Sequence, residues 1–354
     1  MALRWYSGSD RGAISLGRPA LAPLHDISRR RFLKYGALSL AFASAARPQS
    51  DTPLQVATGS PDRAAPDLES TPITAATDAA KHLMVDVRID DNGPYRFVVD
   101  TGADRTVLAT DVAAELGLLV GERVMLEGVV RAVEAQAVRI RELSFGSIRC
   151  RHLVVPTLPR SALRADGYLG LDTLDGHRVT FDFKNHTLQV SEPRSRLSTL
   201  WVRDNEIRIH TVGSSGHLRA VNCSVDGVRA AAFIDSGADV SVGNMSLFAA
   251  LASRNPAYGN LGPVSLTDVT GGETLGNFTN AKKIQIMEVE FTDCPLVIAD
   301  FKVFDLWGLA QRPALLIGMN FLLQFSKVSI DYGLKELRFD RAGLTAPPGN
   351  VYVL

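Results

Sequence analysis

Two copies of one short segment constrain the fold of this chain more than any other feature. The sequence Asp-Thr-Gly-Ala-Asp at residues 100–104 returns 135 positions later as Asp-Ser-Gly-Ala-Asp at residues 235–239. Each copy follows a short apolar run, at residues 97–99 and 233–234. Two such loops at the ends of strand-like runs predict a pair of carboxylates that meet across a pseudo-twofold axis. Such a pair shares one proton, because like charges at close range cannot both ionise.

The residues around the two loops follow the same order in both halves of the chain. Each loop is preceded by two strand-like runs joined by a turn, at residues 91–93 in the first half and 226–227 in the second. A short helical pattern follows each loop, at residues 110–118 and 245–252. The expected strands span residues 83–89, 95–99, 120–126, 135–140 and 152–155, then 218–225, 228–234, 284–291 and 296–299.

Both halves also close in the same way. A segment of two apolar residues and a glycine ends at Gly170 and again at Gly318, and each is followed by a strand with an internal acid, at residues 179–183 and 328–332. The chain is therefore expected to be an internal duplication of one β-rich unit of about 110–140 residues, an ordinary domain size. We predict an all-β fold of two pseudo-twofold-related lobes with short helices.

The N-terminal region has the order of an export signal. Ser-Arg-Arg-Arg-Phe-Leu-Lys at residues 28–34 precedes an uncharged stretch, residues 35–46, that ends in small residues. The apolar part is about a dozen residues, whereas a membrane-spanning helix needs about 20. We expect a twin-arginine signal read by the twin-arginine translocase, and a periplasmic or secreted protein. An uncleaved signal that acts as a membrane anchor and a basic disordered tail are the alternatives.

Composition divides the rest of the chain. Residues 47–79 are rich in Pro, Ser, Thr, Ala and Asp, which is typical of a flexible linker. The expected segments are an export signal at residues 1–46, the linker at 47–79, an N-terminal lobe at 80–190, an interlobe connection at 191–205, a C-terminal lobe at 206–342 and a tail at 343–354.

Charge and cysteine content exclude several classes of function. The chain has 38 Lys and Arg against 38 Asp and Glu, so no net charge favours nucleic acid as a partner. The seven histidines show no HExxH spacing, no glycine-rich phosphate loop is present, and we expect neither a metal nor a cofactor. The three cysteines, Cys150, Cys223 and Cys294, cannot make a full disulfide framework, and we expect free or buried thiols at Cys150 and Cys294.

The residue types of the two loops suit acid–base chemistry. We expect Asp100 and Asp235 to face each other around one water, so that one carboxylate acts as the base and its protonated partner polarises a substrate carbonyl. The glycines allow the two loops to approach closely, and the hydroxyls bond to the backbone of the opposite loop. The residues expected to support the loops are Thr101, Gly102, Ser236 and Gly237.

These segments resemble the retropepsin-like aspartic proteases. Residues 100–108 look very like the active-site loop of retroviral proteases, which are homodimers, but this chain carries both loops. The resemblance implies a single-chain bacterial aspartic endopeptidase that acts on a peptide or protein without a cofactor, and we expect a monomer. It also implies that Asp104 and Asp239 contact the substrate backbone. The alternative is a fold of this kind that no longer cuts, serving as a peptide-binding or envelope-scaffold protein.

The resemblance also implies β-hairpin flaps that close over bound peptide. Residues 268–276 offer a glycine-rich tip at Gly271 and Gly272, and residues 127–131 are the bulkier equivalent in the first lobe. An ordinary turn is the alternative reading of Gly271-Gly272.

The residue after each loop glycine bears on the pH range. Pepsin-type loops usually place Ser or Thr there, but this chain has Ala103 and Ala238. Without a hydroxyl to stabilise the ionised carboxylate, the pKa values of the pair are expected to rise. We predict a mildly acidic to near-neutral optimum.

Overall fold

The computed structural model describes residues 4–6, 73–77, 82–192, 206–212, 219–256, 258–259, 261–286, 289–340 and 351–353. Its contacts divide the chain into one unit of Met1–Arg11 with Leu68–Leu354 and a second of Gly12–Asp67, and all described residues belong to the first. Apart from residues 4–6, the predicted export signal lies outside the described residues, as does most of the predicted linker. No helix in the described ranges is long and apolar enough to cross a membrane.

The first lobe begins with a hairpin whose strands alternate as the sequence predicts. In β3 (Leu83–Ile89) every second side chain is buried, and β3 pairs antiparallel with β4 (Asn92–Val99). Its turn lies one residue earlier than predicted, at Asp90-Asp91, because both residues adopt the left-handed backbone that a two-residue hairpin turn requires, with φ of 48° and 69°. This hairpin carries the chain into the first Asp-Thr-Gly loop.

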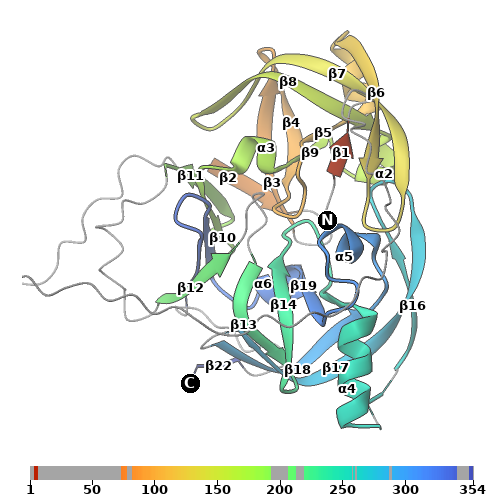
Figure 1. Ribbon diagram of the computed structural model, residues 1–354. Coiled ribbons are helices and arrows are strands. Elements are labelled where there is room, and N and C mark those ends of the chain that lie inside the picture. Colours follow the sequence, from red (N-terminus) through yellow and green to blue (C-terminus); the bar gives the residue numbers. More distant parts are fainter. Residues whose placement is uncertain are drawn as a thin grey trace, which may run out of the picture. The chain divides into compact units, whose positions relative to one another are not determined.

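The rest of the first lobe folds back on this hairpin (Figure 1). Strand β9 runs parallel to β4 and antiparallel to β5, which in turn runs parallel to β8. The predicted helix is confirmed as α1, and Gly117 follows it with φ of 58°. The elements are β5 (Val107–Ala109), α1 (Thr110–Glu115), β6 (Leu119–Glu127), β7 (Ala132–Phe145), β8 (Ile148–Leu158), α2 (Arg160–Leu163), β9 (Gly167–Leu169) and α3 (Leu171–Leu174), and β1 (Arg4–Tyr6) pairs with β6.

The second lobe repeats this order and these pairings. Strand β14 runs parallel to β19, and β15 runs antiparallel to β19 and parallel to β18. The elements are β13 (Arg219–Val225), β14 (Val228–Ile234), β15 (Val242–Gly243), α4 (Met245–Arg254), β16 (Gly262–Thr267), β17 (Glu273–Ile286), β18 (Val289–Ile298), α5 (Lys302–Leu306), β19 (Ala314–Ile317) and α6 (Met319–Leu322), and β22 (Val351–Val353) pairs with β18. The duplication of an all-β unit into two lobes is confirmed.

One predicted strand of the second lobe was wrong. Residues 284–291 were expected to form a single strand, but β17 ends at Ile286 and β18 begins at Val289. The two strands pair antiparallel, with Ile284 opposite Phe291, so the apolar run is two strand ends of one hairpin. A continuous apolar stretch cannot distinguish these arrangements, because both ends bury their side chains in the same core.

A six-stranded antiparallel sheet joins the lobes, in the order β2-β11-β10-β20-β21-β12. At its centre β10 and β20 pair with Thr180 opposite Ser329, whose hydroxyl oxygens lie 2.8 Å apart. Strand β2 lies within the predicted linker, so that linker ends earlier than predicted, because β11 and β3 both supply backbone partners to it. The strands are β2 (Ile73–Thr77), β10 (Arg178–Asp182), β11 (Thr187–Ser191), β12 (Glu206–Val212), β20 (Lys327–Asp331) and β21 (Glu336–Asp340).

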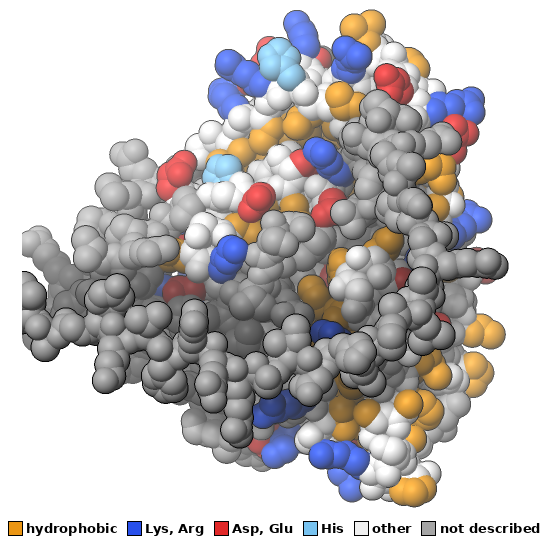
Figure 2. Space-filling view, in the orientation of Figure 1, with side chains coloured by type: hydrophobic (Ala, Val, Ile, Leu, Met, Phe, Trp, Pro, Cys, Tyr) orange, Lys and Arg blue, Asp and Glu red, His pale blue; other side chains and the backbone are white. Residues whose placement is uncertain are grey.

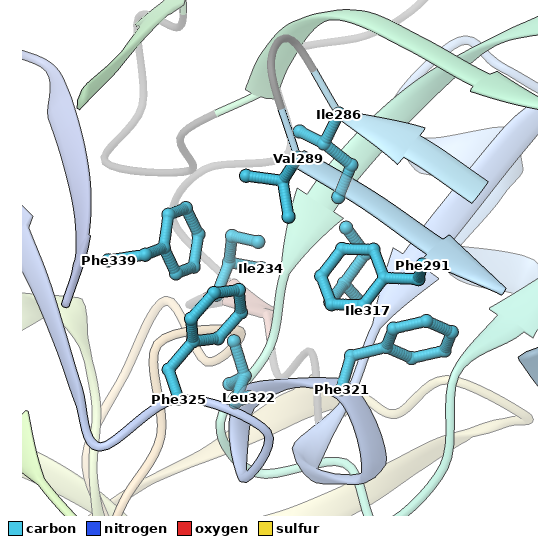
Figure 3. Close-up of a pocket in the computed structure, with 9 residues that line it drawn as sticks. All are labelled: Ile234, Ile286, Val289, Phe291, Ile317, Phe321, Leu322, Phe325 and Phe339. Atoms are coloured by element: carbon cyan, nitrogen blue, oxygen red, sulfur yellow. The ribbon is translucent and has the colours of Figure 1, made fainter. Parts of the chain in front are cut away.

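Charged side chains lie on the described surface (Figure 2), and apolar side chains fill the core. Basic and acidic side chains are interspersed over the described part of the face in Figure 2. Beneath the second loop, nine apolar side chains point toward a common centre (Figure 3) and enclose a void of about 10 Å³. A void of this size and polarity stays empty, so we assign this cluster a packing role. Its members are Ile234, Ile286, Val289, Phe291, Ile317, Phe321, Leu322, Phe325 and Phe339.

We predict that Phe321→Ala lowers the free energy of unfolding by about 3–5 kcal/mol, because it empties a site under the second loop that its neighbours cannot refill. Phe321 is 2% exposed and meets Phe291 edge-on, with ring centroids 5.0 Å apart. Urea denaturation measures the loss. Phe278→Ala is the matched control, since Phe278 is 38% exposed, and it should cost about 1 kcal/mol or less. Equal losses in the two variants would contradict the assigned packing role.

Candidate active site

The two repeated loops place Asp100 and Asp235 at equivalent positions, at the ends of β4 and β14. The backbone N–H of Asp100 donates to Leu169 O at 3.0 Å, and that of Asp235 donates to Ile317 O at 2.9 Å. Both side chains are buried. Each carboxylate oxygen Oδ1 accepts the backbone N–H two residues on, at 2.8 Å from Gly102 and 2.9 Å from Gly237. The two lobes therefore present equivalent carboxylates, and each accepts a hydrogen bond from the equivalent backbone N–H.

The loops lie against each other so closely that a side chain at position 102 is excluded. A Cβ added to Gly102 would lie 2.4 Å from Cγ of Asp235. Real Cβ atoms do not approach other heavy atoms so closely, so glycine is required here by space. The structure thus brings together the two carboxylates that the sequence predicts to meet.

Thr101 and Ser236 hold the two loops together by exchanging hydrogen bonds. The Thr101 backbone N–H donates to Ser236 Oγ at 3.1 Å, and the Ser236 N–H donates to Thr101 Oγ1 at 3.0 Å. Each hydroxyl then donates to the strand of the opposite lobe, Thr101 to Ile234 O at 3.2 Å and Ser236 to Val99 O at 2.8 Å. All of these groups are buried, so both hydroxyls act as donor and acceptor in a closed network.

The two glycine segments lie beneath the loops. A Cβ on Gly170 would lie 2.4 Å from the Arg105 carbonyl carbon, and one on Gly318 would lie 2.7 Å from Ala238 O. The residue after each glycine donates its N–H to a loop carbonyl, Leu171 to Ala103 O at 2.8 Å and Met319 to Ala238 O at 2.8 Å. These contacts fix the loop backbone from below.

Sequence reasoning missed a pair of polar side chains that complete this support. Asp172 Oδ1 accepts the backbone N–H and the hydroxyl of Thr106, both at 2.8 Å, and Thr106 Oγ1 accepts the Gly170 N–H at 3.1 Å. In the second lobe Ser241 donates to Asn320 Oδ1 at 2.7 Å. The available signal was the repeat itself, because both polar residues stand two positions after the repeated glycine.

Burial dominates the electrostatics of the first carboxylate. Removal from water, together with the nearby Asp235 carboxylate, raises the pKa of Asp100 to about 7, although the Gly102 N–H acts in the opposite direction. Because the two carboxylates interact, the proton belongs to the pair and not to one residue. Burial therefore favours the form of the pair that carries one proton.

A cleft of about 790 Å³ opens beside the second loop. Residues of both lobes line it, and apolar side chains make up much of its wall. Polar side chains occur at intervals around this wall, which is typical of a site that fixes the orientation of a ligand. The apolar residues include Val129, Val130, Val242, Leu266, Phe301 and Leu316, and the polar ones include His82, Arg164, Asp235, Asp239 and Asp268.

The tips of two hairpins, β6–β7 and β16–β17, meet over this cleft. The buried Asp268 carboxylate accepts three bonds within its own tip, including Gly272 N–H at 2.8 Å, and one from the other lobe, Val130 N–H at 2.9 Å. Arg131 donates in return to Thr270 O at 2.8 Å. Gly271 has a φ of 71°, in the left-handed region that favours glycine. The two tips are thus locked to each other.

The structure places the predicted substrate contacts unequally. Asp239 lines the cleft with its side chain 59% exposed, and its Oδ1 lies 3.0 Å from Nε2 of His82, a residue of the first lobe. Asp104 is half-buried in the equivalent loop. Whether either residue contacts a substrate stays a prediction.

Metal and thiol chemistry find little support in the described part of the chain. No group of three or more His, Cys, Asp or Glu side chains there is placed to hold a metal ion. The three cysteines are free, and burial raises the pKa of the Cys223 and Cys294 thiols to about 12. Such thiols stay protonated at physiological pH and are poor nucleophiles.

Comparison with known protein families gives a match over both lobes. The family model described as aspartyl protease matches residues 85–173 and 221–321, together more than half of the chain. The matched ranges contain both Asp-Thr/Ser-Gly loops and both glycine segments. No curated protein matches the chain.

We predict that Thr101→Val lowers the free energy of unfolding by about 1–3 kcal/mol, because the shape is kept while the buried Ser236 N–H loses its acceptor. Guanidinium denaturation measures the change, and Ser236→Ala should cost a similar amount. The control is Thr110→Val, at an exposed position. A Thr101→Val variant that is no less stable than this control would show that the exchange of bonds contributes nothing.

Proposed function

The chain belongs to the aspartyl protease family, and on that premise we propose that it is an aspartic endopeptidase whose catalytic pair is Asp100 and Asp235. The observation that carries the proposal is the matched pair of buried carboxylates, one at the end of a strand in each lobe. Each carboxylate accepts the backbone N–H of the residue two positions on, and the two loops exchange hydrogen bonds across the lobe boundary. One proton shared by two such groups suits the activation of water.

The proposed reaction uses the pair as base and acid in one step. The ionised carboxylate takes a proton from a water held between the two groups while the water oxygen attacks the carbonyl carbon of the scissile bond. The protonated carboxyl gives its proton to the carbonyl oxygen, so a neutral tetrahedral diol forms. In the second step the C–N bond breaks as the pair gives its proton to the leaving nitrogen. One diol hydroxyl becomes the carbonyl of the product acid, and its proton returns to the pair. No covalent bond to the enzyme forms at any stage.

The two hairpins act in this proposal as flaps that cover the bound peptide. Their tips are joined by Asp268 to Val130 and by Arg131 to Thr270. Lys302, at the start of α5, also donates its N–H to Val129 O at 2.9 Å. An extended peptide therefore enters when these cross-lobe bonds break. Re-forming them over the substrate excludes water and strengthens electrostatic interactions at the reacting bond.

We predict that Asp100→Asn and Asp235→Asn each lower kcat/KM for peptide cleavage by at least about 10²- to 10⁴-fold, since each removes a proton donor or acceptor from the reacting pair. Cleavage of a mixed peptide library, followed by mass spectrometry, measures the loss. Asp293→Asn is the matched control, at an exposed residue whose φ of 53° asparagine tolerates.

The outcomes of this experiment separate the proposals. Cleavage that survives either substitution would refute the assigned pair. A parent protein that binds a statine-containing peptide but cleaves no member of the library at any pH would favour a non-catalytic peptide-binding protein.

We predict that activity falls as pH rises through about 7. The active form carries one proton on the pair, and burial beside Asp235 raises the pKa of Asp100 to about 7. Below that pH the shared proton is retained, whereas above it both carboxylates ionise and the acid is lost. A kcat/KM profile with its maximum at about pH 2–3, as expected of a strongly acidic pair, would contradict this.

The same pH profile can be shifted by design. Ala103→Ser and Ala238→Ser each introduce a hydroxyl next to a loop glycine, where a donor stabilises the ionised carboxylate. Both variants should move the upper limb of the profile to lower pH. Ala109→Ser, in β5 and as fully buried as Ala103, serves as the control and should leave the profile in place.

A further inference from the structure

An ion pair crosses from one lobe to the other at the edge of the proposed active site. His82 immediately precedes β3 of the first lobe, and its side chain is 5% exposed. Its Nε2 lies 3.0 Å from Oδ1 of Asp239, in the loop that carries Asp235 in the second lobe. Both residues line the same cleft. A histidine almost fully removed from water thus contacts a carboxylate that is still exposed to the cleft.

The surroundings of Asp239 keep its carboxylate ionised. The neighbouring His82 ring is the largest influence that lowers the pKa of Asp239, and the charge of Arg164 acts in the same direction against partial burial. The backbone of Asp239 is fixed from below, since its carbonyl oxygen accepts the Asn320 N–H at 3.3 Å. Only the side chain of Asp239 is therefore able to change its orientation, and the His82 ring restricts that change.

The cleft contains other charged side chains besides His82 and Asp239. Asp235 and Asp268 line the same cleft, but Asp268 is already engaged by the hairpin tips. Arg164 follows α2 and is exposed, and it contributes a positive charge at the edge of the cleft. Of the cleft-lining residues, His82 is the one whose ordinary titration range falls near neutrality.

The histidine also belongs to the duplicated unit. His217 precedes Asp235 by the same number of residues as His82 precedes Asp100. Residue 217 lies outside the described residues, so this is an observation on the sequence alone. It argues against a chance placement of His82 at the start of its strand.

We propose that His82 is a positioning residue that makes substrate binding depend on pH, because its protonated ring orients the Asp239 carboxylate toward the backbone of a bound peptide. The proposal rests on the proposed peptidase function. It adds that His82 strengthens the binding of peptides long enough to reach Asp239. An ionised donor binds a carboxylate about twice as strongly as a neutral one, so loss of the ring proton frees the carboxylate to rotate. Short peptides that end before Asp239 do not sense the change.

The test compares KM and kcat for a long peptide and for the same peptide truncated on either side of the scissile bond. In the parent protein, KM for the long peptide should rise about three- to tenfold between about pH 5 and about pH 8, the interval over which a histidine titrates. KM for the truncated peptide that no longer reaches Asp239 should stay constant. In His82→Gln the KM of the long peptide should lose its pH dependence, and His82→Lys should keep it low throughout because the positive charge persists.

The matched control is His177→Gln, a half-buried histidine with a local contact to the Asp175 carbonyl. This variant should retain the pH profile of the parent protein. The same rise of KM with pH in His82→Gln as in the parent would overturn the proposal, whatever happens to kcat.

A ligand-free measurement keeps this test separate from the proposed function. In NMR titrations the His82 ring signals should change at a lower pH in Asp239→Asn than in the parent, because an adjacent carboxylate favours the protonated ring. Identical titrations in the two proteins would overturn the proposal even if the parent cleaves peptides. A protein that cleaves nothing but shows the shifted titration would refute the peptidase function and leave the ion pair established.

Discussion

The exchange of hydrogen bonds between Thr101 and Ser236 is the interaction on which the rest of this structure depends. Each lobe alone ends a strand in an aspartate, but neither can supply a second carboxylate. The paired hydroxyls fix the two loops at a distance that excludes even a methyl group at position 102. Because the network is buried and every hydroxyl is used twice, a small shift of one lobe would break several bonds at once. This cooperativity gives the pair of carboxylates a defined geometry.

Duplication supplies the symmetry of the site, and departures from it supply the features that distinguish one side from the other. Asp172 in the first lobe corresponds to Asn320 in the second, yet both hold a loop hydroxyl. The hairpin tips differ more, since a carboxylate at Asp268 faces a backbone N–H of the first lobe. A peptide has two different ends, so an unequal cleft of this kind suits its binding in one direction.

The sequence predicted those parts of the fold that local patterns determine. The two loops, the hairpin before each, the short helices and the glycine segments all follow from residues close together in the chain, and the structure contains them. The pairing of β10 with β20 was not predictable, because it joins strands almost 150 positions apart whose patterns do not specify a partner. The contact of His82 with Asp239 and the hydrogen bonds of Asp268 across the hairpin tips were not predicted for the same reason, because each depends on how the two lobes meet. Short apolar runs also misled, as at residues 284–291, where a hairpin replaced one strand.

The central claim is that Asp100 and Asp235 form one site across the two lobes. A crystal structure of the protein with a statine-containing peptide tests it most directly, because the statine hydroxyl takes the place of the attacking water. We predict that this hydroxyl lies within hydrogen-bond distance, about 2.5–3.0 Å, of a carboxylate oxygen of both residues, beneath the closed hairpin tips. A hydroxyl bound to one aspartate alone, or a peptide bound outside the cleft, would contradict the account.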